Sequence, residues 1–133
     1  MIITTKPDKE KAKSIYALLL NRKKFLESLK LDETSSTIIG ETYYEIIKEL
    51  GVILLLLKGF KVYGEYAHKE ILEYLEKENI LTKEETFISQ DLRIKRNYSS
   101  YEGKPISKSY ILSKKEKLLL IISKLDKKVE GLF

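Results

Sequence analysis

The stretch IIGETYYEIIKELGVILLLLK, residues 38–58, decides the fold class of this 133-residue chain. Its apolar residues recur at alternating intervals of four and three, which is the spacing of a helix packed inside a bundle. The series consists of Ile39, Tyr43, Ile46, Leu50, Ile53 and Leu57. Val52, Leu55 and Leu56 add a second apolar side, so we expect this segment to be the central and most buried helix. Gly59 is expected to cap its C-terminus.

The rest of the chain shows helical spacing as well, and we find neither a strand pattern nor an internal repeat. The expected helices cover about residues 7–31, 38–58, 66–78, 83–101 and 107–130. Pro7 suits a first helical turn, Thr82 and Glu85 have capping-box spacing, and Gly131 is expected to follow the last helix. Pro105 disfavours helical geometry at the residue before it. Five helices with short connections predict one all-α domain, residues 1–133: an up-and-down antiparallel bundle with a four-helix core.

Composition restricts the classes of function. Charged residues make up 34% of the chain, and most of them are Lys and Glu. This composition resembles that of heat-adapted proteins. The net charge is +5, but acidic residues are interspersed with the basic ones, so charge alone does not predict nucleic-acid binding. The chain has no Cys, and its one His is His68, which excludes His/Cys zinc sites. We expect no metal and no cofactor, and a structural role for His68.

Two further features bear on location. The longest apolar run, residues 50–57, is shorter than the roughly 20 residues that a membrane helix needs. The first residues lack the apolar core of a signal peptide. With no cysteine for disulfides, we expect a soluble cytoplasmic protein without a membrane partner.

The segment RIKRNYSSYEG, residues 93–103, holds two of the three arginines in the chain. Arg93, Arg96, Asn97 and Ser100 share one polar face of the expected helix. Forked, charge-assisted donors of this kind suit phosphate oxygens. Cations near a helix C-terminus also complement its dipole or pair with surface carboxylates, and the spacing does not decide between these readings. The residues expected to point from this helix into the core are Phe87, Ile94 and Tyr98.

The segment LRIKRNYSSYEG resembles the signature of the HEPN family (higher eukaryotes and prokaryotes nucleotide-binding). In that signature an Arg and a polar residue are followed, four to six residues after the Arg, by a His. The flanking segments LLLLKGFKVYGEYAHKEILEYL and KPISKSYILSKKEKLLLIISKL resemble helices of small archaeal and bacterial members, so the resemblance covers about residues 37–126. It implies a helical bundle that often forms homodimers, with the Arg motifs of two subunits lining a shared cleft. Many members are metal-independent ribonucleases, including toxins paired with small nucleotidyltransferases, and others are nucleotide- or partner-binding modules.

By this resemblance Arg96 matches the motif Arg, Asn97 matches the polar residue, and Tyr101 stands in place of the His. Metal-free RNA cleavage needs a base for the 2′-hydroxyl proton and a cation for the pentavalent phosphate. A His, with a pKa of about 6.5, accepts a proton at neutral pH, whereas a Tyr, with a pKa of about 10, mostly does not. Arg96 and Tyr101 also lie about 140° apart on a continuous helix. We therefore expect them to converge only if the helix unwinds near Ser99 or if a dimer brings them together.

The leading hypothesis is a homodimeric protein that binds a nucleotide or RNA and carries a degenerate ribonuclease motif. We expect it to bind its ligand rather than to cleave it. It would be the partner or substrate-binding subunit of a separate nucleotidyltransferase. The binding cleft is expected at Arg93, Arg96, Asn97 and Tyr101. One alternative is an active, metal-independent, toxin-type endoribonuclease that uses Arg96 with Tyr101 or His68. Another is a non-catalytic helical adaptor whose arginines form ordinary ion pairs. Tyr98 and Tyr101 are also candidates for nucleotidylation by a partner enzyme.

Overall fold

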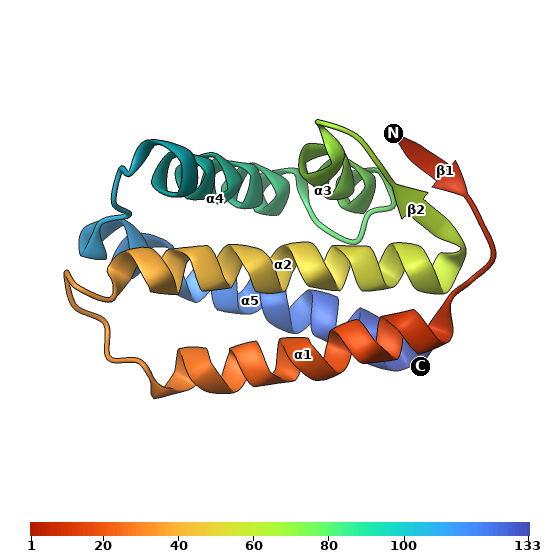
Figure 1. Ribbon diagram of the computed structural model, residues 1–133, viewed down its shortest axis with the longest axis horizontal. Coiled ribbons are helices and arrows are strands. Elements are labelled where there is room, and N and C mark those ends of the chain that lie inside the picture. Colours follow the sequence, from red (N-terminus) through yellow and green to blue (C-terminus); the bar gives the residue numbers. More distant parts are fainter.

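Five helices carry most of the chain in the computed structural model, which describes all 133 residues (Figure 1). The elements in chain order are β1 (Ile2–Thr4), α1 (Lys9–Ser28), α2 (Ser36–Lys58), β2 (Phe60–Val62), α3 (Ala67–Lys77), α4 (Lys83–Glu102) and α5 (Lys108–Leu132). The all-α class and the number of helices are therefore confirmed. None of the helices combines the length and the apolarity that a membrane crossing requires.

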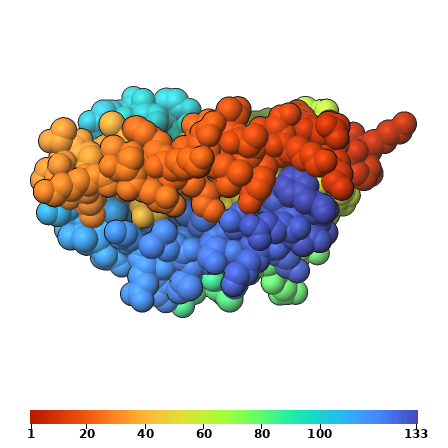
Figure 2. Space-filling view, turned by 90° about the horizontal axis from the view of Figure 1, so that it is seen from below, coloured from red at the N-terminus to blue at the C-terminus, as the bar shows by residue number.

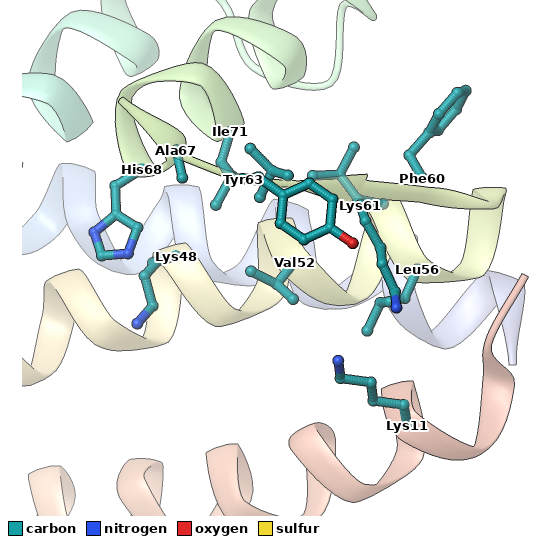
Figure 3. Close-up of a pocket in the computed structure, with 12 residues that line it drawn as sticks. Lys11, Lys48, Val52, Leu56, Phe60, Lys61, Tyr63, Ala67, His68 and Ile71 are labelled. Atoms are coloured by element: carbon teal, nitrogen blue, oxygen red, sulfur yellow. The ribbon is translucent and has the colours of Figure 1, made fainter. Parts of the chain in front are cut away.

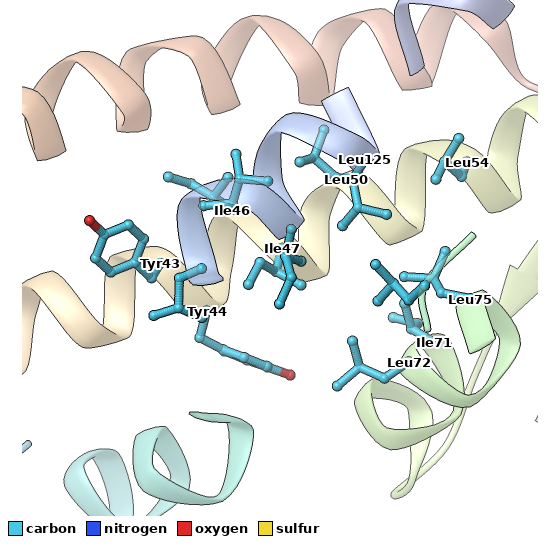
Figure 4. Close-up of a cluster of buried hydrophobic side chains, with 14 of the residues drawn as sticks. Tyr43, Tyr44, Ile46, Ile47, Leu50, Leu54, Ile71, Leu72, Leu75 and Leu125 are labelled. Carbon is cyan, nitrogen blue, oxygen red and sulfur yellow. The ribbon is translucent and has the colours of Figure 1, made fainter. Parts of the chain in front are cut away.

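Helix α2 is the axis of the bundle, as the sequence predicts. It contacts each of the other four helices, and its predicted apolar series is buried except for its last member, Leu57, which is half-buried. Figure 4 shows Tyr43, Ile46 and Leu50 on one side of α2, and Ile71, Leu72 and Leu75 of α3 on the other. Burial of one apolar stripe against several neighbours is what gives such a helix its stability.

The helices around α2 run up and down. Helix α1 is antiparallel to α2, and α5 runs in the same direction as α2 (Figure 1). Helix α4 is antiparallel to α2, because Arg96 contacts Glu45 while the later residue Ser99 contacts the earlier residue Glu41. Helices α1, α2, α4 and α5 therefore form the four-helix core, and the shorter α3 lies over the C-terminal half of α2.

The face formed by α1 and α5 is shown in Figure 2, where the two helices lie side by side. A carboxylate on α5 joins them: Asp126 accepts a hydrogen bond from the Tyr16 hydroxyl at 2.7 Å and from the Lys23 ammonium group at 2.9 Å. This polar link belongs to the face of α2 away from α3 and α4. The candidate site lies on the other side.

The sequence shows no strand pattern, yet the structure contains two strands of three residues each. β1 pairs antiparallel with β2, with Ile2 opposite Val62 and Thr4 opposite Phe60. Three-residue strands are too short for an alternating pattern to be recognised in the sequence. Gly59, between α2 and β2, has the predicted capping role: its φ is +83°, and a Cβ atom there would lie 2.8 Å from the carbonyl oxygen of Thr5.

Several helix ends differ from the prediction. Helix α1 starts at Lys9. Its N-cap is Asp8, whose side chain accepts a hydrogen bond from the Lys11 amide at 3.0 Å. Pro7 therefore precedes the helix and is not in its first turn. The same helix ends at Ser28, three residues earlier than expected. Helix α5 continues through Gly131 to Leu132. The capping box that starts α4, formed by Thr82 and Glu85, is confirmed.

The predicted orientation of α4 is wrong. Phe87, Ile94 and Tyr98 were expected in the core, but they are 71%, 43% and 47% exposed. Helix α4 buries Ile88 and Leu92 instead. Helix α4 therefore has two apolar stripes on opposite sides. The buried stripe lies on the same side of the helix as Arg96 and Ser99, which contact Glu45 and Glu41 on α2.

Candidate functional site

A hollow of about 290 Å³ lies between α4 and the segment that leads from β2 into α3. We call it the arginine hollow. Its lining residues on α4 are Arg93, Arg96, Asn97 and Tyr101, the four residues predicted to form a binding cleft. The structure thus brings the predicted set together in one concave site. Their role in binding stays a prediction.

The four residues line the hollow without any break in the helix. Helix α4 is continuous to Glu102 and ends at Gly103, which has a φ of +67°. The helix therefore does not unwind near Ser99, which was one of the two conditions under which Arg96 and Tyr101 were expected to converge. At about 100° per residue, Arg93 and Asn97 fall between Arg96 and Tyr101 around the helix. The hollow spans this whole arc, so Arg96 and Tyr101 line it from opposite edges.

The opposite wall runs from Gly64 to Lys69 and includes the start of α3. No side chain caps the first turn of α3. The amide of Ala67 donates to the carbonyl of Gly64 at 3.2 Å. The amides that follow it in the first turn carry partial positive charge, so this end favours anions. No group of three His, Asp or Glu side chains is placed to hold a metal ion. The wall also carries the oppositely charged side chains of Glu65 and Lys69, so the positive potential of the hollow comes from the two guanidinium groups and this helix end.

Arg93 is oriented but not neutralised. Its Nε donates to the side-chain oxygen of Gln90 at 2.7 Å, and the amide of Gln90 donates to the carbonyl of Lys69 at 3.1 Å. Gln90 thereby ties α4 to α3 and holds the guanidinium group at the hollow. No carboxylate lies within ion-pair distance of Arg93. Its two terminal nitrogens are therefore available to an incoming anion.

Arg96 is held more tightly and shares a carboxylate partner with Lys48. Its Nη2 lies 3.2 Å from Glu45 Oε1, and its guanidinium carbon lies 5.7 Å from the centre of the Tyr44 ring. Lys48 also donates to Glu45, at 2.8 Å. Burial by itself would raise the pKa of Glu45, but the hydrogen bond and charge of Lys48 and the charge of Arg96 outweigh it and lower that pKa below its usual value. Glu45 is thus an ionised bridge between two cations.

His68 lies in the arginine hollow, on the wall opposite the arginines. Its ring centre is 6.1 Å from that of Tyr44. Burial lowers the pKa of His68, and the nearby positive charges of Lys48 and Arg96 lower it further. The imidazole is therefore neutral at neutral pH and able to accept a proton. The only histidine of the chain, for which a structural role was expected, therefore lies where it could accept a proton from a molecule bound in the hollow.

The remaining predicted residues differ in accessibility. Asn97 Oδ1 accepts from Arg96 at 3.4 Å, which leaves the amide nitrogen of Asn97 free to donate. Tyr101 is 76% exposed at the edge of the hollow. Tyr98 is exposed but lies outside the lining, with the Lys104 ammonium group 4.9 Å from its ring centre. Both tyrosines are accessible for the predicted nucleotidylation.

No family model, no curated protein and no solved structure matches this chain. The HEPN resemblance therefore stays a prediction. Any role for the arginine hollow rests on its own geometry.

The residues that support the arginines were not among those predicted from the sequence. Glu45 and Tyr44 of α2 contact Arg96, Lys48 pairs with the same Glu45, and Gln90 holds Arg93. One signal was present: Glu41, Glu45 and Lys48 lie four and three residues apart, on one side of the most apolar helix. A charged stripe on a buried helix indicates a charged neighbour, because buried charges need partners.

Proposed function

We propose that the arginine hollow binds the phosphate groups of a nucleotide or of RNA. The observation that carries this proposal is Arg93, whose terminal nitrogens are unpaired in a concave site while Gln90 fixes their orientation. The amide of Asn97 and the uncapped start of α3 add donors to the same space. Tyr101 offers an exposed ring at the edge, on which a base can stack.

The outer face of α4 supports a homodimer. Phe87, Ile94, Tyr98 and Tyr101 form an exposed stripe with spacings of seven, four and three, the pattern with which one helix pairs with another. We call these four residues the outer stripe. Tyr101 belongs both to this stripe and to the arginine hollow. Pairing of two copies along α4 would therefore place the two hollows at or beside the interface.

A wider role follows from the HEPN resemblance alone. We propose a homodimeric binding subunit that acts with a separate nucleotidyltransferase and carries a degenerate ribonuclease motif. The adaptor hypothesis accounts for Arg96, which is ion-paired with Glu45. It does not account for Arg93, which has no carboxylate partner and faces a hollow. Binding at the hollow is for this reason the stronger proposal.

The test compares two arginine variants by the fluorescence anisotropy of labelled RNA and of a labelled nucleotide. Arg93→Gln is expected to weaken binding about tenfold or more, since charge-assisted hydrogen bonds to phosphate are lost. Arg22→Gln is the matched control. Arg22 lies outside the hollow, and its Nε pairs with Glu49 at 3.0 Å, so the control removes the same charge. Equal losses in the two variants, or no loss in either, would refute the site.

A second candidate function is metal-independent RNA cleavage, and the position of His68 favours it. The neutral imidazole would take the proton of a 2′-hydroxyl as that oxygen bonds to phosphorus. The bond from phosphorus to the 5′-oxygen then breaks, and this oxygen takes a proton from water, which leaves a 2′,3′-cyclic phosphate. Arg93 and Arg96 would balance the charge of the pentavalent phosphate. In this scheme His68, on α3, is the general base, a role that the motif gives to a His at the position of Tyr101.

RNA cleavage in the presence of a metal chelator tests this candidate. Products with cyclic phosphate ends, lost in His68→Gln while RNA affinity is kept, would establish an enzyme with His68 as its base. Tyr101→Phe serves as the comparison, because it removes the other candidate base. Absence of cyclic phosphate products from varied RNAs would retire the enzyme and leave the binding role to be judged by the anisotropy measurements.

A further inference from the structure

A second hollow, of about 300 Å³, lies between α1, α2, β2 and the start of α3 (Figure 3). We call it the lysine hollow. It shares only Ala67 and His68 with the arginine hollow. Most of its lining is apolar, with Val52 and Leu56 of α2 beneath it and Ile71 of α3 beside them. Its volume is at the lower end of the roughly 300–1,000 Å³ typical of pockets that bind organic ligands.

The charged groups of this hollow are all cationic. Lys11 comes from α1, Lys48 from α2 and Lys61 from β2, and no Asp or Glu lines the space. Lys48 is paired with Glu45 at 2.8 Å, whereas Lys11 and Lys61 have no carboxylate within ion-pair distance. The hollow therefore carries two unbalanced positive charges over an apolar base.

The two unpaired ammonium groups converge. Figure 3 shows the ends of Lys11 and Lys61 pointing toward one another across the opening, with the hydroxyl group of Tyr63 turned to the same space. Like charges that face each other repel, and an anion between them removes the repulsion and accepts hydrogen bonds from both. The tyrosine hydroxyl supplies a third donor at the same place.

We propose that the lysine hollow binds a small amphipathic anion. Its carboxylate or phosphate group lies between Lys11 and Lys61, and its apolar body lies against Val52, Leu56 and Ile71. An inorganic anion would leave this apolar surface uncovered, and a neutral apolar molecule would leave the two ammonium groups unpaired. The proposal does not rest on the proposed function, because it depends on different residues from the phosphate site at Arg93.

Isothermal titration calorimetry of the full chain tests the proposal with two probes from different sources, octanoate and adenosine monophosphate. Each is paired with its uncharged counterpart, octanol or adenosine. We expect at least one anion to bind, about tenfold or more tightly than its uncharged counterpart. Failure of both anions to bind, or equal binding of the uncharged molecules, overturns the proposal. The preferred probe identifies whether the ligand is an acyl or a nucleotide anion.

Variants then locate the bound anion. Lys11→Gln/Lys61→Gln is expected to weaken binding about tenfold or more, and Ala67→Leu is expected to abolish it by filling the hollow. The matched control is Lys13→Gln/Lys30→Gln, which removes the same charge at exposed positions outside the hollow and is expected to bind as the unmodified protein does. Thermal unfolding of each variant confirms that it is folded.

One more variant separates this site from the phosphate site. Arg93→Gln should leave the binding of octanoate unchanged, because Arg93 does not line the lysine hollow. Adenosine monophosphate that loses affinity in Arg93→Gln but not in Lys11→Gln/Lys61→Gln is bound in the arginine hollow. Together with an absence of octanoate binding, this result overturns the second site and supports the proposed function.

Discussion

Among single residues, His68 allows the cleanest test of pH dependence, because it is the only histidine of the chain. Burial and the charges of Lys48 and Arg96 lower its pKa in the folded protein. Above its ordinary value of about 6.5, both the folded and the unfolded chain hold it neutral. As the pH falls below that value, the unfolded chain binds a proton first, so the free energy of unfolding decreases by at most about 1.4 kcal/mol per pH unit. Urea unfolding between about pH 7 and pH 5 measures this slope, and an unchanged slope in His68→Gln would contradict the assignment.

Glu45 is the residue at which stability and binding are expected to change in opposite directions. Glu45→Gln removes the carboxylate that bridges Arg96 and Lys48, whose side chains are 20% exposed. We expect a loss of about 1–2 kcal/mol in unfolding free energy, between the values for exposed and buried pairs. The freed Arg96 should strengthen RNA binding in the anisotropy assay. Glu49→Gln frees Arg22 outside the hollow and is the control; weaker RNA binding by Glu45→Gln would contradict a phosphate role for Arg96.

At the scale of elements, α4 is the helix with two apolar sides and only one of them covered. Ile94→Glu places a charge in the middle of the outer stripe, so a dimer formed along α4 should become a monomer in sedimentation velocity. Leu112→Glu on α5 is the control, because Leu112 is 59% exposed and lies outside the stripe. A wild-type protein that sediments as a monomer, or a dimer that survives Ile94→Glu, would rule out this interface.

The contact between α2 and α3 depends on Gly51. A Cβ atom at that position would lie 2.4 Å from the side chain of Ile71, which is itself fully buried. Overpacking costs about 1–3 kcal/mol, more than the gain of about 1 kcal/mol from replacing a glycine inside a helix. Gly51→Ala should therefore lose up to about 2 kcal/mol of unfolding free energy, measured by thermal unfolding. Gly131→Ala meets no neighbouring atom and should keep or raise the stability, and equal effects of the two changes would refute the close approach.

For the whole molecule, the position of α2 predicts a single cooperative unfolding transition, since this helix contacts all the others. Leu50 is fully buried at its centre (Figure 4). Leu50→Ala should cost about 2–5 kcal/mol in denaturant unfolding monitored by circular dichroism. Leu18→Ala, at a position 60% exposed, should stay within about 0.5 kcal/mol of the unmodified protein. Loss of only part of the helical signal in a separate transition would contradict a single core.

The sequence by itself determined the features that depend on neighbouring residues. The apolar series in α2 identified the central helix, Thr82 and Glu85 marked the start of α4, and Gly59 marked the end of α2. These features are local, because helical periodicity and capping act within a few residues. The predicted binding set also came from one helix, and spacing along that helix was enough to place Arg93 and Asn97 together.

Only the tertiary structure decided what lies opposite those residues. Spacing fixes where a side chain sits around its own helix, but not how that helix is rotated against its neighbours, which depends on how the whole core packs. For this reason the covered side of α4 was predicted wrongly. The pair of Arg96 with Glu45, 51 residues apart, and the position of His68 beside the arginines could not be read from the chain. The site is formed only where α2, α3 and α4 meet, because its residues and their partners come from all three helices.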